Sequence, residues 1–309
     1  MSGVAILCSG QGAQDAAMFD LLAEAPAAAP VFEAAKAVLD GADPRELVRQ
    51  QSSEAIHADK LGQILCCTQT MATWAVIADL MPPPLLVAGY SIGELGAWGV
   101  AGLFGAARVI SLAAERATAM DEATTEPSGL AAIRGLSRAK LEPICRSHGC
   151  FIAIVNGPDQ MLVGGTRASL DALLADASAA GAERTTLLPV AVASHTPLLA
   201  AASERFGHVL DAAPTPPALP SGVRLLSGID AAPVLDIAAG KAKLARQIQQ
   251  TVDWAACMDA CRAADIGKIV ELGPGSALCR IARDAMPGVD ARSVSDFHSL
   301  AGFIAWVKR

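Results

Sequence analysis

The chain has 309 residues, 52% of them hydrophobic, and a formal net charge of -7 without a run of basic residues. This length is enough for one large domain with an insertion or for two domains, and the apolar content predicts a sizeable core. The acidic balance argues against a surface for nucleic acid or for an anionic membrane.

The first residues run directly into an apolar, strand-like segment at 4–7, without the pattern of a signal peptide. No segment is predicted to be long and apolar enough to span a bilayer. The eight cysteines lack the spacing of metal ligands, so no metal site is expected. We expect reduced thiols in a cytoplasmic protein, with the adjacent Cys66 and Cys67 interpreted as buried small hydrophobic residues rather than a redox pair.

A Gly-Gln-Gly turn centred on Gln11 follows this strand, and helices are predicted at 18–39, 43–51 and 60–80. The two glycines let the backbone of the turn come close to a ligand. On its own, the turn is more typical of an ordinary strand-to-helix loop than of a ligand site. The last helix is mostly apolar, and we expect it to pack beneath the segment that comes next.

Residues 85–95 read as an apolar strand, a sharp turn and a helix. The turn carries Gly-x-Ser-x-Gly at 89–93, with Ser91 at its centre. In a nucleophile elbow, the serine occupies a strained strand-to-helix corner, and the glycines let the two backbones pass closely. The helix points its N-terminal N–H groups toward the serine, where they can stabilise an oxyanion. The flanking strand and helix favour a nucleophile over a structural turn.

A helix predicted at 106–121 carries Arg116 on the same face as its apolar residues. Burying an unpaired charge is costly, so an arginine on that face suggests an anionic partner. The alternative is a long stem that packs on apolar surface while its head reaches water. Periodicity leaves both readings open. Arg108 lies on another side of the helix and is expected to be solvated.

The stretch 128–193 has its own pattern of elements, in the order βαββαβ. Strands are predicted at 131–133, 151–155, 161–163 and 186–192, and helices at 137–147 and 166–180. This order suits a small ferredoxin-like domain that is inserted into a larger one. The predicted division is therefore a small domain at 128–193 and a large domain made of 1–127 and 194–309.

His195 precedes a Thr-Pro pair that can begin a helix reaching about residue 211. It therefore lies at a junction of the kind that often presents functional side chains, although a satisfied structural histidine is the alternative. The rest of the chain predicts strands at 223–226, 268–272 and 291–294 and helices at 240–250, from 276 and at 300–308.

Ser91 needs a base, because a free serine hydroxyl is a poor nucleophile. His195 is the best candidate, since it lies downstream at a junction. No acid between the two stands out, which favours a Ser–His pair whose histidine is oriented by an amide or a backbone carbonyl. The oxyanion hole would use the N–H of Ile92 and a second donor from another loop, for which the Gln11 backbone is a candidate.

Taken together, these residues resemble the family of malonyl-CoA:acyl-carrier-protein transacylases. The resemblance covers nearly the whole chain, with matching order and spacing of Gly10-Gln11-Gly12-Ala13-Gln14, Gly89-Tyr90-Ser91-Ile92-Gly93-Glu94, Arg116, Asn156, Ser194-His195, Gln247 before Trp254, and Gly273-Pro274-Gly275. It implies an α/β fold, with an α/β-hydrolase-like core, a parallel sheet and a ferredoxin-like insertion. It also implies ping-pong acyl transfer without a bound cofactor, with malonyl-CoA and the phosphopantetheine-type thiol of an acyl carrier protein as substrates.

The resemblance further implies roles for single residues. Ser91 would carry the malonyl group as an ester, and His195 would act as general base and acid. The backbone carbonyl of Gln247 would hold the histidine. Arg116 would pair with the free malonyl carboxylate, for which the bidentate guanidinium is well suited. Gln11 and Ile92 would supply the oxyanion N–H groups.

Tyr90, the only tyrosine, departs from the family pattern, because members that serve fatty-acid synthesis usually have histidine before the nucleophile. The elbow is more similar to that of the transacylase (epsilon) subunit of malonate decarboxylase. That subunit is expected to load the phosphoribosyl-dephospho-CoA thiol of a dedicated carrier. A fatty-acid or polyketide malonyl transacylase is the alternative. Asn156 corresponds to a family asparagine near the cleft and receives no firm role.

Two other classes of protein remain as rivals. A serine thioesterase or esterase would share Ser91 and His195, but it would have no use for a carboxylate clamp at Arg116. A subunit that only docks a carrier protein would not need a nucleophile. Whether water or a thiol accepts the acyl group depends on how the acyl-enzyme excludes water.

Overall fold

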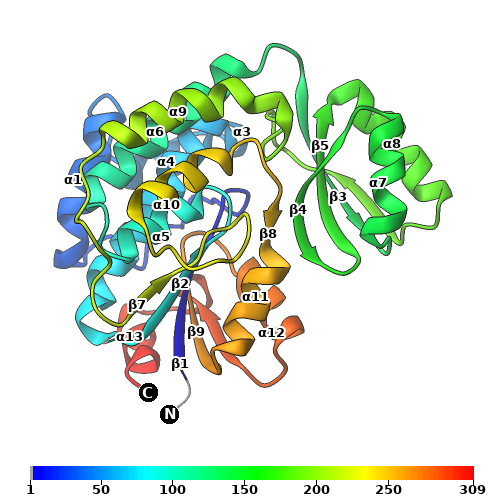
Figure 1. Ribbon diagram of the computed structural model, residues 1–309. Coiled ribbons are helices and arrows are strands. Elements are labelled where there is room, and N and C mark those ends of the chain that lie inside the picture. The colour runs from blue at the N-terminus through cyan, green and yellow to red at the C-terminus, as the bar shows by residue number, and fades with distance from the viewer. Residues whose placement is uncertain (1–2, 82) are drawn as a thin grey trace.

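The structure, a computed structural model, describes residues 3–81 and 83–309 (Figure 1). Its first sheet has the strand order β10-β9-β1-β2-β7, and all neighbours are parallel. Parallel strands that are covered on both faces need apolar residues at every position, and all five residues of β2 are buried. The strands are β1 (Gly3–Cys8), β2 (Leu85–Gly89), β7 (Val223–Leu225), β9 (Ile266–Leu272) and β10 (Asp290–Ser293).

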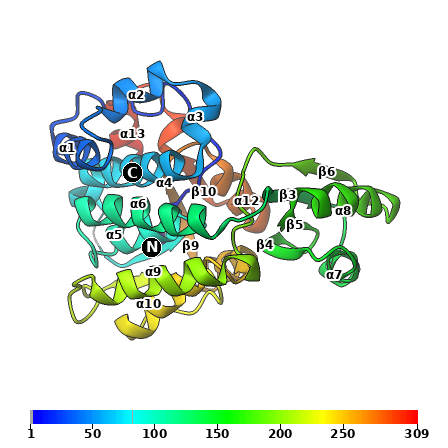
Figure 2. The same cartoon turned by 90° about the horizontal axis from the view of Figure 1, so that it is seen from above.

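Helices cover both faces of this sheet, and alternate residues of β1 show the division. Ile6 and Cys8 belong to the core formed with α4, α5 and α6, whereas Ala5 and Leu7 pack with residues of α11 and α12. Figure 2 shows α6, α9 and α10 side by side. The α-helices of this part are α1 (Ala29–Val38), α2 (Pro44–Gln50), α3 (Ser53–His57), α4 (Asp59–Ile77), α5 (Gly93–Val100), α6 (Ala106–Ala123), α9 (Ala200–Ala212), α10 (Ile237–Arg246), α11 (Trp254–Ala263), α12 (Ala277–Ala285) and α13 (Leu300–Val307).

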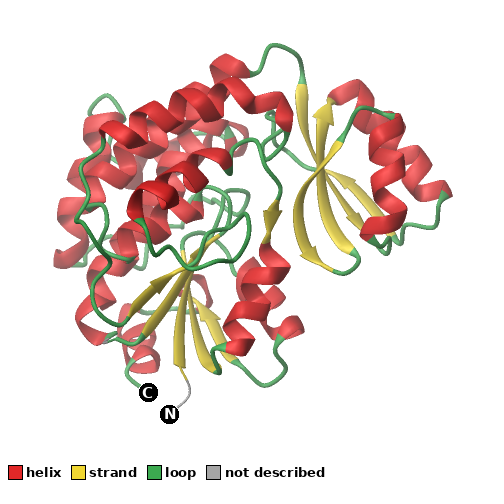
Figure 3. Cartoon of the chain, in the orientation of Figure 1, coloured by secondary structure: helices red, strands yellow, loops and turns green. Residues whose placement is uncertain are grey.

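The second sheet has the order β6-β3-β5-β4-β8, and α7 and α8 cover the face that points away from the first sheet (Figure 3). Its first four strands and two helices follow the predicted order βαββαβ. The fifth strand, β8, comes from beyond residue 193 and pairs in parallel with β4. The division at 128–193 remains our proposal. These elements are β3 (Ser128–Arg134), α7 (Arg138–Ser147), β4 (Phe151–Gly157), β5 (Gln160–Thr166), α8 (Arg167–Ala179), β6 (Arg184–Leu187) and β8 (Val252–Asp253).

Helix α4 corrects one expectation from the sequence. The 22-residue segment Asp59–Leu80, which adds the short 3₁₀ turn η2 (Ala78–Leu80) to α4, is long and apolar enough to cross a membrane, because an 18-residue window within it has a mean hydropathy of 1.3. The prediction that no segment has this property was therefore wrong. However, 72% of that window is buried inside the protein, where α4 packs against α1, α5 and α6. Contact on several sides explains why the helix is apolar on most of its surface.

Three predicted elements have other bounds in the structure. The helix expected at 18–39 is a series of turns, then the 3₁₀ helix η1 (Pro26–Ala28) and α1, because proline fits only the first turn of a helical segment. The strand expected at 186–192 ends at Leu187, before a proline that removes a ladder donor. The helix expected at 240–250 ends at Arg246. Two further 3₁₀ helices are η3 (Pro197–Leu199) and η4 (Val294–Asp296).

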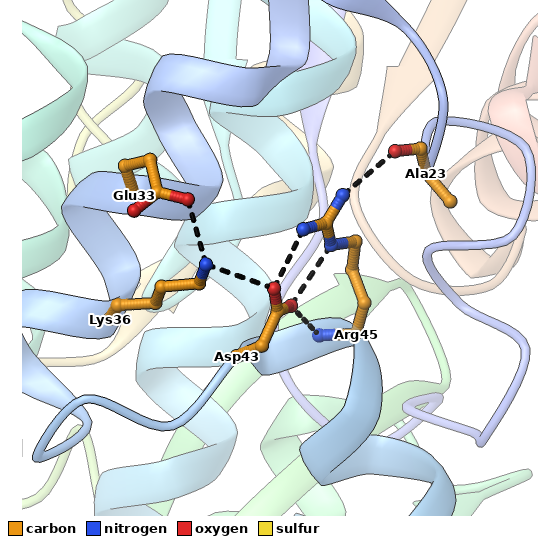
Figure 4. A network of polar contacts seen from close by, with 5 residues as sticks. All are labelled: Ala23, Glu33, Lys36, Asp43 and Arg45. Atoms are coloured by element: carbon orange, nitrogen blue, oxygen red, sulfur yellow. Dashed lines mark hydrogen bonds and ion pairs between the residues drawn. The ribbon is translucent and has the colours of Figure 1, made fainter.

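A polar network links α1 to the start of α2, far along the chain from the elbow (Figure 4). Asp43 caps α2 by accepting from the backbone N–H of Arg45 at 2.9 Å, and it also accepts from the guanidinium of Arg45 at 2.6 and 2.9 Å. Lys36 lies 3.2 Å from the same carboxylate. The pKa of Asp43 is well below its usual range, and the hydrogen bonds from Arg45 are the main cause. This network orders the α1–α2 connection and has no contact with the candidate site.

Candidate active site

Ser91 occupies the corner between β2 and α5 in a strained backbone conformation, with φ at 55°. The two flanking glycines explain why this corner forms. A Cβ on Gly89 would lie 2.2 Å from the carbonyl oxygen of Gly93, and a Cβ on Gly93 would lie 2.1 Å from the carbonyl oxygen of Cys8. Any side chain at either position would therefore force the strand and the helix apart. The geometry is that of a nucleophile elbow.

Ser91 and His195, 104 residues apart in sequence, meet at this corner. The distance from Ser91 Oγ to His195 Nε2 is 2.7 Å, and that from His195 Nδ1 to the backbone oxygen of Gln247 is also 2.7 Å. Because a carbonyl only accepts, Nδ1 donates its proton to it, which leaves Nε2 free to accept from the serine hydroxyl. Burial and the neighbouring Arg116 charge lower the pKa of His195 to about 3. The imidazole is thus neutral and able to act as a base.

The carbonyl of Gln247 is available because α10 ends one residue earlier, at Arg246. A carbonyl in the interior of a helix is occupied by the N–H four residues further along, whereas those of the last turn are free for other donors. The expected continuation of this helix to residue 250 was wrong, and its early end creates the acceptor for His195. The backbone N–H of His195 also donates to the carbonyl of Ile248 at 2.7 Å, which fixes the histidine to the same turn.

The two predicted oxyanion donors belong to the elbow and to the loop that packs against it. Ile92 immediately precedes α5, and the loop of Gln11 packs against the elbow, since a Cβ on Gly10 would lie 2.9 Å from the carbonyl oxygen of Tyr90. In residues 3–81 and 83–309, neither the N–H of Ile92 nor that of Gln11 donates a hydrogen bond to another protein group. Both donors are therefore free for an oxygen that arrives at Ser91.

Arg116 is only 2% exposed, which rules out the reading in which its head reaches water. Its guanidinium donates to Gln63 Oε1 at 2.7 Å and to Gln247 Oε1 at 3.3 Å, and both acceptors are neutral amides. None of the ion pairs formed among the described residues includes Arg116. A buried cation without a directly bonded anion can gain strongly from a carboxylate ligand.

Sequence reasoning missed three polar residues of this site. Gln63 donates to Asp59 Oδ2 at 2.8 Å, and Gln11 Nε2 lies 3.2 Å from Asp59 Oδ1, so Asp59 reaches Arg116 only through an amide. Burial raises the pKa of Asp59. Glu94 accepts from the side chain of Gln247 at 2.7 Å. A polar glutamine in the mostly apolar helix α4 was a signal that could have identified Gln63 as a site residue. Glu94 gave no such signal, because its partner Gln247 lies far away in the sequence.

A small cavity of about 70 Å³ lies at the predicted catalytic residues. Ser91, His195 and Arg116 line it, together with Gln11 and Gln63 and with apolar side chains of the second sheet and its neighbouring loop, namely Leu130, Ile154, Leu162, Leu188 and Val190. A larger hollow of about 780 Å³ adjoins it and shares Gln11 and Asp59. Ser91 and Arg116 thus face a small space that lies next to a larger one.

Tyr90 lines the same cavity, and its ring meets that of Trp254 edge to face at 5.4 Å between centroids. Burial raises the pKa of the Tyr90 hydroxyl to about 12, while a hydrogen bond with Asn156 acts in the opposite direction. Asn156 lies behind the tyrosine and lines a separate hollow, and its side-chain oxygen is buried without a hydrogen-bond partner in the described structure. Tyr90 therefore lines the same cavity as Ser91 and His195, whereas Asn156 lines another hollow and contacts Tyr90.

All eight cysteines are buried and unbonded, which confirms that Cys66 and Cys67 are packed as small hydrophobic residues. Burial raises the pKa of Cys67 to about 12, so its thiol is unreactive. In the part of the chain that the structure describes, no group of three or more His, Cys, Asp or Glu side chains is placed to hold a metal ion.

Comparison with known protein families shows which family of enzymes the chain belongs to. The family described as acyl transferase domain matches residues 6–299. The chain belongs to this acyl transferase family. A malonyl CoA-acyl carrier protein transacylase of Mycobacterium tuberculosis is 32% identical to the acyltransferase over an alignment of 299 positions, which covers 94% of this chain and 96% of that one. The protein of the same name from Salmonella typhimurium is 28% identical over an alignment of 307 positions, which covers 96% of this chain and 97% of that one.

Solved structures agree with this assignment. The crystal structure of MCAT from Mycobacterium tuberculosis superposes with a TM-score of 0.88 at 30% identity, covering 99% of each chain. A type II polyketide acyl carrier protein in complex with its malonyl-transacylase contains a chain with a TM-score of 0.91 at 27% identity, covering 98% of the acyltransferase and 99% of that chain. The predicted family and the predicted α/β fold with two sheets are confirmed.

Proposed function

We propose that the acyltransferase moves a malonyl group from malonyl-CoA to the thiol of an acyl carrier protein through an ester on Ser91. The observation that carries the proposal is the placement of Arg116, a buried cation without a directly bonded anion, in the same small cavity as the Ser91–His195 pair. The names of the relatives support malonyl as the acyl group and a carrier as the acceptor.

In the first half-reaction, Nε2 of His195 takes the Ser91 hydroxyl proton while Oγ attacks the thioester carbonyl. The negative charge moves onto the carbonyl oxygen, where the N–H groups of Ile92 and Gln11 can stabilise it; one such donor typically contributes about 3 kcal/mol. The C–S bond then breaks, and the CoA sulfur leaves with the proton from His195. The ester on Ser91 and free CoA are the products.

The second half-reaction reverses these roles. The carrier thiol gives its proton to His195, and its sulfur attacks the ester carbonyl. The bond from carbon to Ser91 Oγ breaks, and the imidazolium returns the proton to the serine. The backbone oxygen of Gln247 faces the proton on Nδ1 throughout, so it holds the ring in one tautomer without a carboxylate partner.

Arg116 would select the acyl group. A guanidinium can donate two parallel hydrogen bonds to the carboxylate at the far end of malonyl, and a cavity of about 70 Å³ leaves little room for a long acyl chain. A serine thioesterase has no use for such a clamp. It remains the alternative only if the ester on Ser91 passes to water as readily as to a thiol.

The carrier is the finer part of the proposal. Tyr90 before the nucleophile favours the malonate decarboxylase carrier, whose prosthetic group is phosphoribosyl-dephospho-CoA, and a carrier of fatty-acid or polyketide synthesis is the alternative. Both would place the reaction in the cytoplasm. Tyr90 lines the cavity, so we expect a substitution of Tyr90 to affect how the acyl group and the arm of the carrier that accepts it bind there.

A discharge experiment tests both levels of the proposal. The malonyl ester on Ser91 is prepared, freed from malonyl-CoA and offered to each carrier in its thiol form and to buffer alone. Faster discharge to the malonate decarboxylase carrier in wild type, with that preference reduced in Tyr90→His, would support the finer assignment. A fatty-acid carrier that discharges faster would replace it, and equal rates with carriers and buffer would favour the thioesterase.

A further inference from the structure

Gln247 contacts Ser91, His195 and Arg116 at once through its side chain and its backbone oxygen. Its Nε2 donates to the backbone oxygen of Ser91 at 2.9 Å and to Glu94 Oε2 at 2.7 Å. Its Oε1 accepts from Arg116 at 3.3 Å, and its backbone oxygen accepts from His195. Both N–H bonds of the amide are in use, and the amide oxygen has one charged donor.

Glu94 determines which way this amide points. The two ends of a carboxamide have nearly the same shape but opposite hydrogen-bonding character. An ionised carboxylate only accepts hydrogen bonds, so ionised Glu94 bonds with the NH₂ end of the Gln247 amide. The amide oxygen then faces Arg116. The reversed amide would set its oxygen against the carboxylate and its N–H groups against the guanidinium. Both contacts would be repulsive.

Burial raises the pKa of Glu94 to about 7, whereas the side chain of Gln247 and the charge of Arg116 act in the opposite direction, so the side chain is a carboxylate above about pH 7. The residue is 1% exposed and lies in the first turn of α5, where the helix dipole favours a negative charge. The backbone of Gly228 packs against the carboxyl group of Glu94. A Cβ on Gly228 would lie only 2.6 Å from Glu94 Oε2, so this close approach requires glycine. The nearby charged groups are Arg116 and Asp230, from two other segments.

We infer that Glu94 is a positioning residue for acyl-group selection, which fixes the amide of Gln247 so that its oxygen holds Arg116 where the acyl carboxylate binds. This inference rests on the proposed function. It differs from a role in proton transfer, because Glu94 touches neither His195 nor the Ser91 hydroxyl. It also gives the side chain of Gln247 a function separate from that of its backbone carbonyl.

Glu94→Gln tests the inference, because it keeps the shape of the side chain and removes its acceptor-only character. The new NH₂ group can then face the oxygen of a reversed Gln247 amide, whose own N–H groups would point at Arg116. We expect kcat/KM for loading from malonyl-CoA to fall about 10- to 100-fold, the usual effect of losing a hydrogen bond to a charged group. Loading from acetyl-CoA, which carries no second carboxylate, should change less than about 3-fold by the same reasoning.

Glu271→Gln is the matched control. Glu271 is also fully buried and accepts from Ser9 Oγ at 2.8 Å and from the N–H groups of Leu278 and Cys279 at 3.1 and 2.7 Å. It makes no hydrogen bond to Gln247 or Arg116. The control therefore reports the effect of neutralising a buried carboxylate near the elbow, and it should leave the ratio of malonyl to acetyl loading unchanged.

Three results would overturn the inference: malonyl loading within 2-fold of wild type in Glu94→Gln, equal losses for both acyl donors, or the same change of ratio in Glu271→Gln. If Glu94→Gln does not fold, Gln247→Met decides, because it keeps the backbone carbonyl and removes the amide. A selective loss of malonyl loading supports the inference, and an unchanged preference refutes it. A wild-type enzyme that never forms a malonyl ester on Ser91 would instead refute the proposed function itself.

Discussion

Replacement of Arg116 by alanine is the sharpest perturbation of the site. The guanidinium is buried, donates to Gln63 and Gln247, and makes no ion pair within the described structure. Alanine removes the charge and leaves both amide oxygens facing a new void. A malonyl ester on Ser91 would then hold a carboxylate in a small cavity without its counter-ion.

The size of the effect follows from the burial of Arg116. Two unit charges about 4 Å apart at an effective dielectric constant of about 20 interact by about 4 kcal/mol. Removing one partner of a buried pair costs about 3–5 kcal/mol. Because about 1.4 kcal/mol corresponds to a tenfold change, kcat/KM for malonyl loading should fall by a factor between about 10² and about 4 × 10³. Acetyl lacks the second charge, so acetyl loading should lose less than about tenfold on the same scale.

The assay follows ester formation by intact-protein mass spectrometry with malonyl-CoA and with acetyl-CoA. Arg108→Ala is the matched control, because Arg108 lies on the same helix but pairs with Glu115 at a partly exposed site. That control should leave both donors within about twofold of wild type, as is usual for an exposed pair. Equal losses with the two donors in Arg116→Ala would show that the arginine only supports the fold, and the carboxylate clamp would be wrong.

Three further predictions concern the serine, the elbow and the histidine. Ser91→Ala should form no acyl-enzyme, and a covalent malonyl adduct in that variant would remove Ser91 from the mechanism. Gly93→Ala should lower the free energy of unfolding by more than about 2 kcal/mol in urea titration, because its Cβ would lie 2.1 Å from a carbonyl oxygen. Gly105→Ala, whose Cβ meets nothing within 4 Å, should change it by less than about 1 kcal/mol; similar effects would refute the packing argument. The pKa of His195 is lowered from 6.5 to about 3, so below about pH 6.5 the unfolded state binds a proton that the folded state does not. Stability should therefore decline from about pH 6.5 toward 3, and more steeply in wild type than in His195→Gln; parallel curves would contradict it.

Local chemistry made the elbow predictable from the sequence. The strand before Ser91 is a run of apolar residues, the turn has glycine on both sides, and the helix begins at once. Each of these signals depends only on neighbours within a few residues. The structure has the strand at Leu85–Gly89 and the helix from Gly93, with Ser91 at positive φ.

The end of α10 shows what a single sequence does not reveal. The segment 240–250 continues with residues that are compatible with a helix, and neither glycine nor proline marks the stop at Arg246. What ends the helix is tertiary contact: Gln247 is held by Ser91, Glu94, Arg116 and His195, which lie between 52 and 156 residues away in the sequence. Such contacts depend on the assembled fold and leave no local pattern.

Arg116 lies between these two cases. Periodicity placed it on the apolar face of its helix, which was enough to pose the question of a partner but not to answer it. The answer needed the burial of the side chain and the identity of its acceptors, both of which come from α4 and from the turn after α10. Resemblance to a family supplied the substrate carboxylate as the partner, and the cavity shared with Ser91 is consistent with it.

In the proposed reaction, Ser91 carries a malonyl ester on its way to a carrier thiol. The most direct test is intact-protein mass spectrometry of the wild-type enzyme after mixing with malonyl-CoA, followed by peptide mapping and addition of a carrier thiol. We expect one malonyl group on Ser91, discharged faster by the thiol than by water. A chain that remains unmodified, or an ester that buffer removes as fast as the thiol does, would refute this reaction.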